Sequence, residues 1–224
     1  MESENRKCSI FKIYGVLGAL IEVCMFAGIA YCVREFGITS LQKMDAVTYY
    51  WLTFITLVGF WELIYITCHK KTIEIAQELL ETKTKVWTNK YGLSMLLPWN
   101  FSKLFYAEYA AYADREYMST KDKWSVLVEG SHATFCAFFA MVSLGVFYHS
   151  EKSFDASLSF AMGSQFMNSL LYMGEYFIQV KDENSVNFNT PSFPTGWALT
   201  KRFFMWINVF WLVMPIYVMH RFFL

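Results

Sequence analysis

The stretch Val47–His69, VTYYWLTFITLVGFWELIYITCH, decides the fold class of this chain. Its one Asp, Glu, Lys or Arg residue is Glu62, and about 20 mostly apolar residues are enough for an α-helix to cross a bilayer. The stretch therefore predicts a transmembrane helix. An ionisable group costs at least ~2.5 kcal/mol inside the hydrocarbon, so Glu62 should face the protein interior.

Four further segments have the same character, near residues 10–33, 124–148, 154–179 and 202–223. The chain has 224 residues, of which 55% are hydrophobic, and this suits one membrane domain. We therefore predict an all-α fold: a single integral membrane domain over 1–224, a bundle of five transmembrane helices with an amphipathic interfacial segment. The net charge is zero, which does not suggest a nucleic-acid partner.

The connection 70–123 joins the second and third predicted spans. Thr72–Tyr91 predicts an amphipathic helix at the membrane interface, because apolar residues recur on one face against acidic ones. Phe101–Tyr112 predicts a second short helix, and Ser119 predicts the cap of the third span. Residues 181–201 contain prolines and Gly196, which predict an ordered loop.

Lysine and arginine are concentrated on one side of the predicted bundle. With five spans, the N-terminus, the connection 70–123 and the loop 181–201 share a side, and that side holds most of the basic residues. The positive-inside rule assigns this side to the cytoplasm. We expect a cytoplasmic N-terminus and, more weakly, a location in the endoplasmic reticulum.

Polar residues also gather at one depth, in the cytoplasmic half of the predicted spans or near the midplane. Counting along the helices at 1.5 Å per residue places at this depth Glu22, Glu62, Glu129, Glu175, Asn208 and Trp211. The helical repeat puts several of them on inward stripes: Glu62, Tyr65 and His69; Glu129, His132 and Cys136; Gln165, Asn168, Tyr172, Glu175 and Gln179; Asn208, Trp211 and Pro215.

Each of these groups has a structural alternative. Glu22 is better explained by helix packing or by contact with a partner than by a site role. Glu175 would equally be a boundary charge, and His132 would equally be a satisfied structural histidine. Glu62 and Glu129 are the strongest functional candidates, because apolar residues flank both. The His and carboxylate spacings do not form a metal-binding set, and no cofactor is expected.

Several motifs resemble the EXPERA family, which includes the emopamil-binding protein, a sterol Δ8–Δ7 isomerase, and the sigma-2 receptor. They are Gly59-Phe60; Glu108-Tyr109-Ala110 with Asp114-Arg115-Glu116-Tyr117; Gln165 through Leu171-Tyr172; and the stretch 207–215, INVFWLVMP. The resemblance covers helices two to five, in the order of the family. Glu62 stands where the isomerase has a histidine, and Ile66 where it has a glutamate.

The resemblance implies a pocket for a sterol or other polycyclic or isoprenoid lipid and chemistry through a carbocation. Glu129 corresponds to the essential glutamate of the family and would be the counter-charge, whereas Glu62 would be the acid. Trp211 would supply a cation–π face. The other expected substrate-binding residues are Glu108, Asp114, His132, Gln165, Tyr172 and Asn208.

Three functions stay open: an isomerase-like enzyme that shifts C=C bonds, a non-catalytic sterol- or lipid-binding protein or structural subunit of a membrane complex, and a terpene cyclase. Membrane lipids are expected partners in each case, and a homodimer or a membrane complex is possible. The roles of Glu22 and Glu175 stay open as well.

Overall fold

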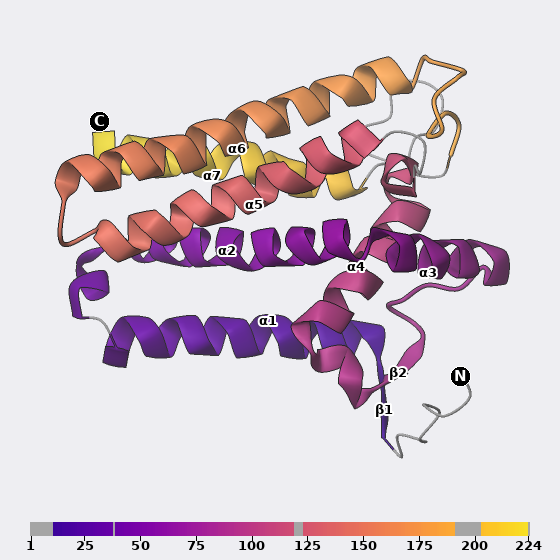
Figure 1. Cartoon of the computed structure of the whole chain (residues 1–224), viewed down its shortest axis with the longest axis horizontal. Helices are drawn as coiled ribbons and strands as arrows, with labels where there is room; N and C mark the ends of the chain where they lie inside the picture. The colour runs from indigo at the N-terminus through magenta and orange to yellow at the C-terminus, as the bar shows by residue number, and fades with distance from the viewer. Residues whose placement is uncertain (1–10, 38, 119–122, 191–202, 224) are drawn as a thin grey trace.

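The computed structural model describes residues 11–37, 39–118, 123–190 and 203–223, and this part of the chain is mostly helical (Figure 1). The predicted cap at Ser119 and the second half of the predicted loop 181–201 lie outside the described residues. The α-helices are α1 (Gly15–Cys32), α2 (Ala46–Thr67), α3 (His69–Thr82), α4 (Pro98–Tyr112), α5 (Lys123–Val146), α6 (Glu151–Gln179) and α7 (Phe203–Phe223). Shorter elements are a π-helical turn (Val33–Gly37) and 3-10 turns (Thr39–Lys43, Leu93–Leu96 and Arg115–Met118).

The long helices lie lengthwise beside one another; at one end of the bundle α3 continues roughly in line with α2, and α4 runs across the other helices (Figure 1). Helix α2 packs mainly on α5, α5 on α6, and α6 on α7. A Cβ atom at Gly59 would overlap the Ala137 side chain and the Ala133 carbonyl, so glycine lets the α2 and α5 backbones approach closely. The five predicted helices therefore all exist, and the first begins at Gly15 rather than near residue 10.

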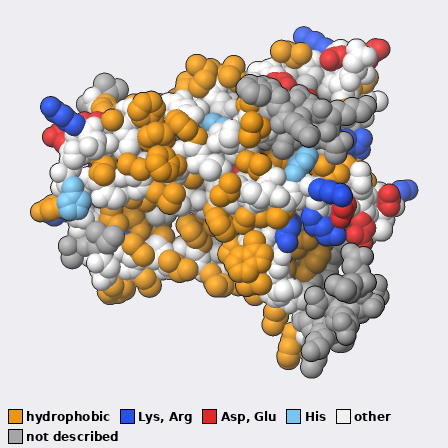
Figure 2. All heavy atoms as spheres, viewed as in Figure 1, with side chains coloured by type: hydrophobic (Ala, Val, Ile, Leu, Met, Phe, Trp, Pro, Cys, Tyr) orange, Lys and Arg blue, Asp and Glu red, His pale blue; other side chains and the backbone are white. Residues whose placement is uncertain are grey.

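Three of the helices are long and apolar enough to cross a membrane: Gly15–Gly37, Ala46–Thr67 and Met205–Phe223. Helices α5 and α6 have 24 and 29 residues, but within the described residues they do not meet the same criterion of length and hydropathy. In Figure 2, hydrophobic side chains cover the middle of the molecule, whereas charged side chains gather toward its ends. This distribution fits a membrane protein, and the prediction of five spans is not confirmed.

The predicted amphipathic helix Thr72–Tyr91 is too long. Helix α3 ends at Thr82, because Lys83 adopts a left-handed conformation (φ 53°) that stops the helix. Its apolar face, with Ile73, Ala76 and Leu79, is buried, and Ala76 and Leu79 pack against α4. The apolar face is therefore covered by the protein itself rather than left for the membrane surface or a partner.

A small two-stranded sheet departs from the all-α prediction. Strand β1 (Lys12–Tyr14) pairs antiparallel with β2 (Lys90–Gly92), with Ile13 opposite Tyr91. Just after β1, the first turn of α1 packs against the backbone at Val86 through Gly15. Further along α1, Glu22 is buried within the chain, 4% exposed, so it does not present a charge to a partner.

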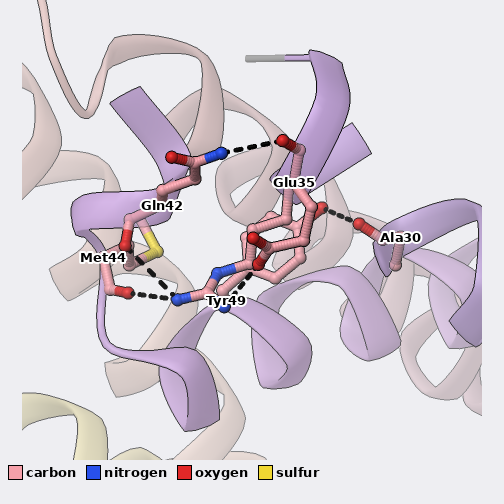
Figure 3. A network of polar contacts seen from close by, with 6 residues as sticks. Ala30, Glu35, Gln42, Met44 and Tyr49 are labelled. Atoms are coloured by element: carbon pink, nitrogen blue, oxygen red, sulfur yellow. Dashed lines mark hydrogen bonds and ion pairs between the residues drawn. The ribbon is translucent and has the colours of Figure 1, made fainter. Parts of the chain in front are cut away.

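The turn between α1 and α2 is fixed by a network around Arg34 (Figure 3). The Arg34 guanidinium donates to the Glu35 carboxylate and to the backbone carbonyls of Gln42 and Met44, at 3.0, 3.4 and 3.1 Å. The Tyr49 hydroxyl donates to the Ala30 carbonyl at 2.7 Å and so ties α2 to α1. The bonds from Arg34 satisfy backbone carbonyls of the irregular turn, and the bond from Tyr49 adds a second donor to the Ala30 carbonyl at the end of α1.

Candidate functional site

The candidate site forms where the second half of α2 meets α4. Glu62 is 7% exposed, and the hydroxyl of Tyr106 donates a hydrogen bond to its carboxylate. Burial, and then the charge of Glu62, raises the pKa of the Tyr106 phenol, so this hydroxyl stays protonated as a donor. The Ser102 hydroxyl donates to the Trp61 carbonyl at 2.7 Å, which holds α4 against α2 at this level.

Tyrosine rings pack around Tyr106, the hydrogen-bond partner of Glu62. The ring of Tyr65, one turn after Glu62, lies 5.0 Å from Tyr106 and 5.2 Å from Tyr117. Tyr117 also stacks on Tyr106, at 6.1 Å, and meets Tyr109 edge to face, at 4.9 Å. A carboxyl group among aromatic faces is suited to a hydrophobic ligand that carries or develops positive charge.

A hydrogen-bonded chain of hydroxyls leads from this tyrosine cluster to a buried carboxylate. The hydroxyls of Tyr109 and Tyr172 are 2.6 Å apart, and Tyr172 donates to Asp114 at 2.7 Å. Because Tyr172 uses its one proton on Asp114, Tyr109 is the donor to Tyr172. The structure thus brings Asp114 and Tyr172 together, as predicted members of one site, although they are 58 positions apart in the sequence.

Asn187 completes the shell around Asp114, and sequence reasoning missed it. Its amide donates to Asp114 at 2.8 Å and to Gln179 at 3.0 Å, and it accepts from the Arg115 amide at 2.8 Å. The Asn187 side chain, the Glu116 amide and the Tyr172 hydroxyl all donate to the Asp114 carboxylate, which is 2% exposed, and so satisfy its charge. Asn187 lies in the connection after α6, where no helical repeat could have indicated its position.

Glu108, a predicted substrate-binding residue, has a structural position. Its carboxylate accepts a hydrogen bond from the Val86 amide at 2.7 Å and is 6% exposed. Burial raises the pKa of Glu108, and the Val86 amide and the charge of Lys85 oppose this rise. Glu108 thus holds the turn after α3 through its carboxylate, and a role in substrate binding stays a prediction.

His132 contacts α6 rather than the Glu62–Tyr106 pair. Its Nε2 atom is 3.3 Å from the Cys136 sulfur, and both residues hydrogen-bond to Ser164 of α6. These contacts join α5 to α6. His132 therefore has hydrogen-bond partners within the protein, as the structural alternative for this residue requires.

Gln165 and Trp211 form a second group, deeper in the bundle. The indole N–H of Trp51 donates to the side-chain amide oxygen of Gln165 at 3.2 Å. The Trp51 ring lies 5.2 Å from the ring of Trp211, which also stacks on Phe54 at 5.7 Å. Phe54 and Trp51 precede Glu62 by 8 and 11 residues, or about 12–16 Å along the helix. Trp211 therefore does not stack over Glu62, contrary to the expectation of one shared pocket.

The remaining predicted residues are located by their helices. Glu129 belongs to α5, next to Gly130, which packs against Ile66 of α2; its side chain is outside the described part. Asn208 is half-buried on α7. A groove of about 410 Å³ lies between α6 and α7, at the end of α7 far from α3 and α4, and includes Gly163 and Pro215.

Comparisons of this chain with protein-family models, with curated proteins and with solved structures find no match.

Proposed function

We propose that this chain is a membrane-embedded isomerase-like protein that binds a sterol or isoprenoid lipid beside Glu62. It would move a carbon–carbon double bond in this lipid by protonation and deprotonation. The observation that carries the proposal is the environment of Glu62: a buried carboxyl group on a candidate membrane span, hydrogen-bonded to Tyr106, whose ring packs against those of Tyr65 and Tyr117.

The reaction needs no redox partner. Glu62 in its acid form would transfer its proton to one alkene carbon, which leaves a carbocation on the other carbon. Loss of a proton from a neighbouring carbon to a carboxylate would then form the new double bond. The faces of Tyr65, Tyr106 and Tyr117 would stabilise the cation, by ~2 kcal/mol or more per desolvated contact. Glu129 would be the counter-charge.

The chain Tyr109–Tyr172–Asp114 would restore the protonation state of the site. It offers ordered hydroxyls between the tyrosine cluster and the buried carboxylate of Asp114. Positioned acid–base groups of this kind typically accelerate a reaction 10²–10⁴-fold.

The motif resemblance to the EXPERA family supports the same proposal. We also propose five spans, formed by α1, α2, α5, α6 and α7, with the N-terminus in the cytoplasm, as the distribution of lysine and arginine predicts, and the protein in the endoplasmic reticulum. Helices α5 and α6 would then be less apolar than usual because they line the pocket.

A second candidate function is non-catalytic binding of a sterol or a lipophilic amine. It is favoured by Ile66, which stands one turn after Glu62 and packs against Gly130. Helix α2 therefore supplies one carboxylate where the isomerase family has a histidine and a glutamate.

The test is rescue of the sterol profile in cells that lack sterol Δ8–Δ7 isomerase. The wild-type chain should restore the Δ7 product, whereas Glu62→Gln and Glu129→Gln should each lower conversion at least 100-fold. Glu78→Gln, an exposed carboxylate on α3, is the matched control and should rescue fully. No rescue by well-expressed wild-type protein would exclude the isomerase proposal, and binding of a lipophilic amine by that protein would then support the second candidate.

A further inference from the structure

A basic crevice of about 440 Å³ lies where α2 ends and α3 begins. Its lining residues come from the α2–α3 junction and from α4: Thr67, Cys68, Lys70, Lys71, Glu74 and Lys103. This crevice is separate from the Glu62 site, and the isomerase proposal does not use it. In Figure 2, basic side chains gather at the end of the molecule where α3 lies.

Two separate elements bring the lysines together. Lys70 and Lys71 follow α2 directly, in the first turn of α3. Lys103 comes from α4, and the neighbouring Ser102 is hydrogen-bonded to α2 through the Trp61 carbonyl. This bond holds the part of α4 that carries Lys103 against α2, and Lys103 lines the crevice together with the two other lysines.

The charge of the crevice is positive after internal pairing. Lys71 is bonded to Glu74 at 3.1 Å, and both side chains are largely exposed. Lys70 and Lys103 have no ion pair among the described residues. Two ammonium groups therefore face the same hollow, and a bound anion would relieve their mutual repulsion.

The depth of the crevice identifies the source of that anion. Helix α2 is long and apolar enough to cross a membrane and ends at Thr67, a lining residue. The end of a span lies at the level of the lipid headgroups, where lysines attract anionic lipids. We propose that this crevice binds the phosphorylated headgroup of an anionic membrane lipid.

The experiment uses the full chain in a neutral detergent, titrated with dioctanoyl phosphatidylinositol 4-phosphate and followed by thermophoresis. Binding should saturate, and dioctanoyl phosphatidylcholine and inorganic phosphate should each bind at least tenfold more weakly. Lys70→Gln with Lys103→Gln should weaken binding of the phosphoinositide about 30-fold, because each lysine near a lipid headgroup contributes about fivefold.

The matched control replaces exposed lysines elsewhere, Lys43→Gln with Lys152→Gln, and should leave the affinity within twofold. An equal loss in the control would show attraction by net charge and would overturn the proposal. Equal binding of inorganic phosphate would overturn the lipid source, and equal binding of phosphatidylcholine or no binding at all would overturn the site. Circular dichroism of each variant checks that its helices are intact.

Discussion

Glu108 shows, at the scale of one residue, how a buried carboxylate can serve the fold. Its carboxylate accepts a hydrogen bond from the Val86 amide, a backbone group in the turn after α3 that would otherwise need a water molecule. Any oxygen acceptor at this position would serve that purpose, and the negative charge is a cost of burial.

We therefore predict that Glu108→Gln keeps the fold and that Glu108→Ala destabilises it by ~1–3 kcal/mol, the cost of an unsatisfied buried amide. Because the pKa of Glu108 is raised in the folded protein, its stabilising effect is complete below the unfolded pKa near 4.5 and is lost as the pH rises through the folded pKa. Glu108→Gln should remove this dependence. Thermal unfolding in detergent between pH 4 and 8 measures both effects.

Loss of ligand binding in a stable Glu108→Gln variant would contradict a purely structural role and support the predicted one. The sequence could not separate the roles of Glu62 and Glu108. Glu62 lies in an apolar stretch, so the cost of exposing its charge to lipid predicts burial. The partner of Glu108 is a backbone amide 22 positions away, and no motif indicates that contact.

The contact of α2 with α5 is the central packing feature at the scale of helices. Gly59 of α2 faces Ala133 and Ala137, and Gly130 of α5 faces Ile66. Each helix therefore has a glycine where the other helix packs against it. In lipid, close packing of this kind replaces the hydrophobic effect as a source of helix association.

We predict that Gly59→Ala destabilises the bundle by about 1–3 kcal/mol, because the new methyl group meets the Ala133 carbonyl, which is backbone and cannot turn away. Gly28→Ala on α1 is the control: its Cβ would meet no atom within 4 Å, so it should be neutral or stabilising by up to ~1 kcal/mol. Unfolding in a mixed detergent measures the difference between the two variants. Equal stability would mean that α2 and α5 do not approach as closely as described.

The helices follow from apolar segment length, which is why their ranges could be predicted to within a few residues. The end of α3 could not, because lysine seldom adopts the left-handed conformation that Lys83 has. The sheet was missed for another reason. Two strands of three residues carry no readable alternation, and their pairing joins segments far apart in the sequence.

For the whole molecule, the proposed five spans make a definite statement about sidedness. The turn between α5 and α6 would lie opposite to α3, whereas the connection after α6 would lie on the same side as α3. If only α1, α2 and α7 crossed the membrane, then α3, the turn between α5 and α6, and the connection after α6 would all lie on one side.

We predict that single cysteines at Glu81 and Glu183 react with a membrane-impermeant maleimide from the cytoplasmic side of sealed vesicles. A cysteine at Lys152 should react only after permeabilisation. All three positions are exposed, and the background replaces Cys8, Cys24, Cys32 and Cys68 by serine while keeping the buried Cys136. Labelling of Lys152→Cys from the same side as the cysteines at positions 81 and 183 would rule out five spans.

The pairing of β1 with β2 has a consequence for the order of synthesis. Strand β1 and helix α1 leave the ribosome early. Strand β2, the partner of β1, ends at Gly92, 78 positions after Tyr14. At 5–20 residues per second, roughly 4–16 s of synthesis separate the two strands, so β1 has no strand partner during that interval. The contact of α1 with α2 through Tyr49 needs a shorter length of chain, so the two anchors of α1 form one after the other.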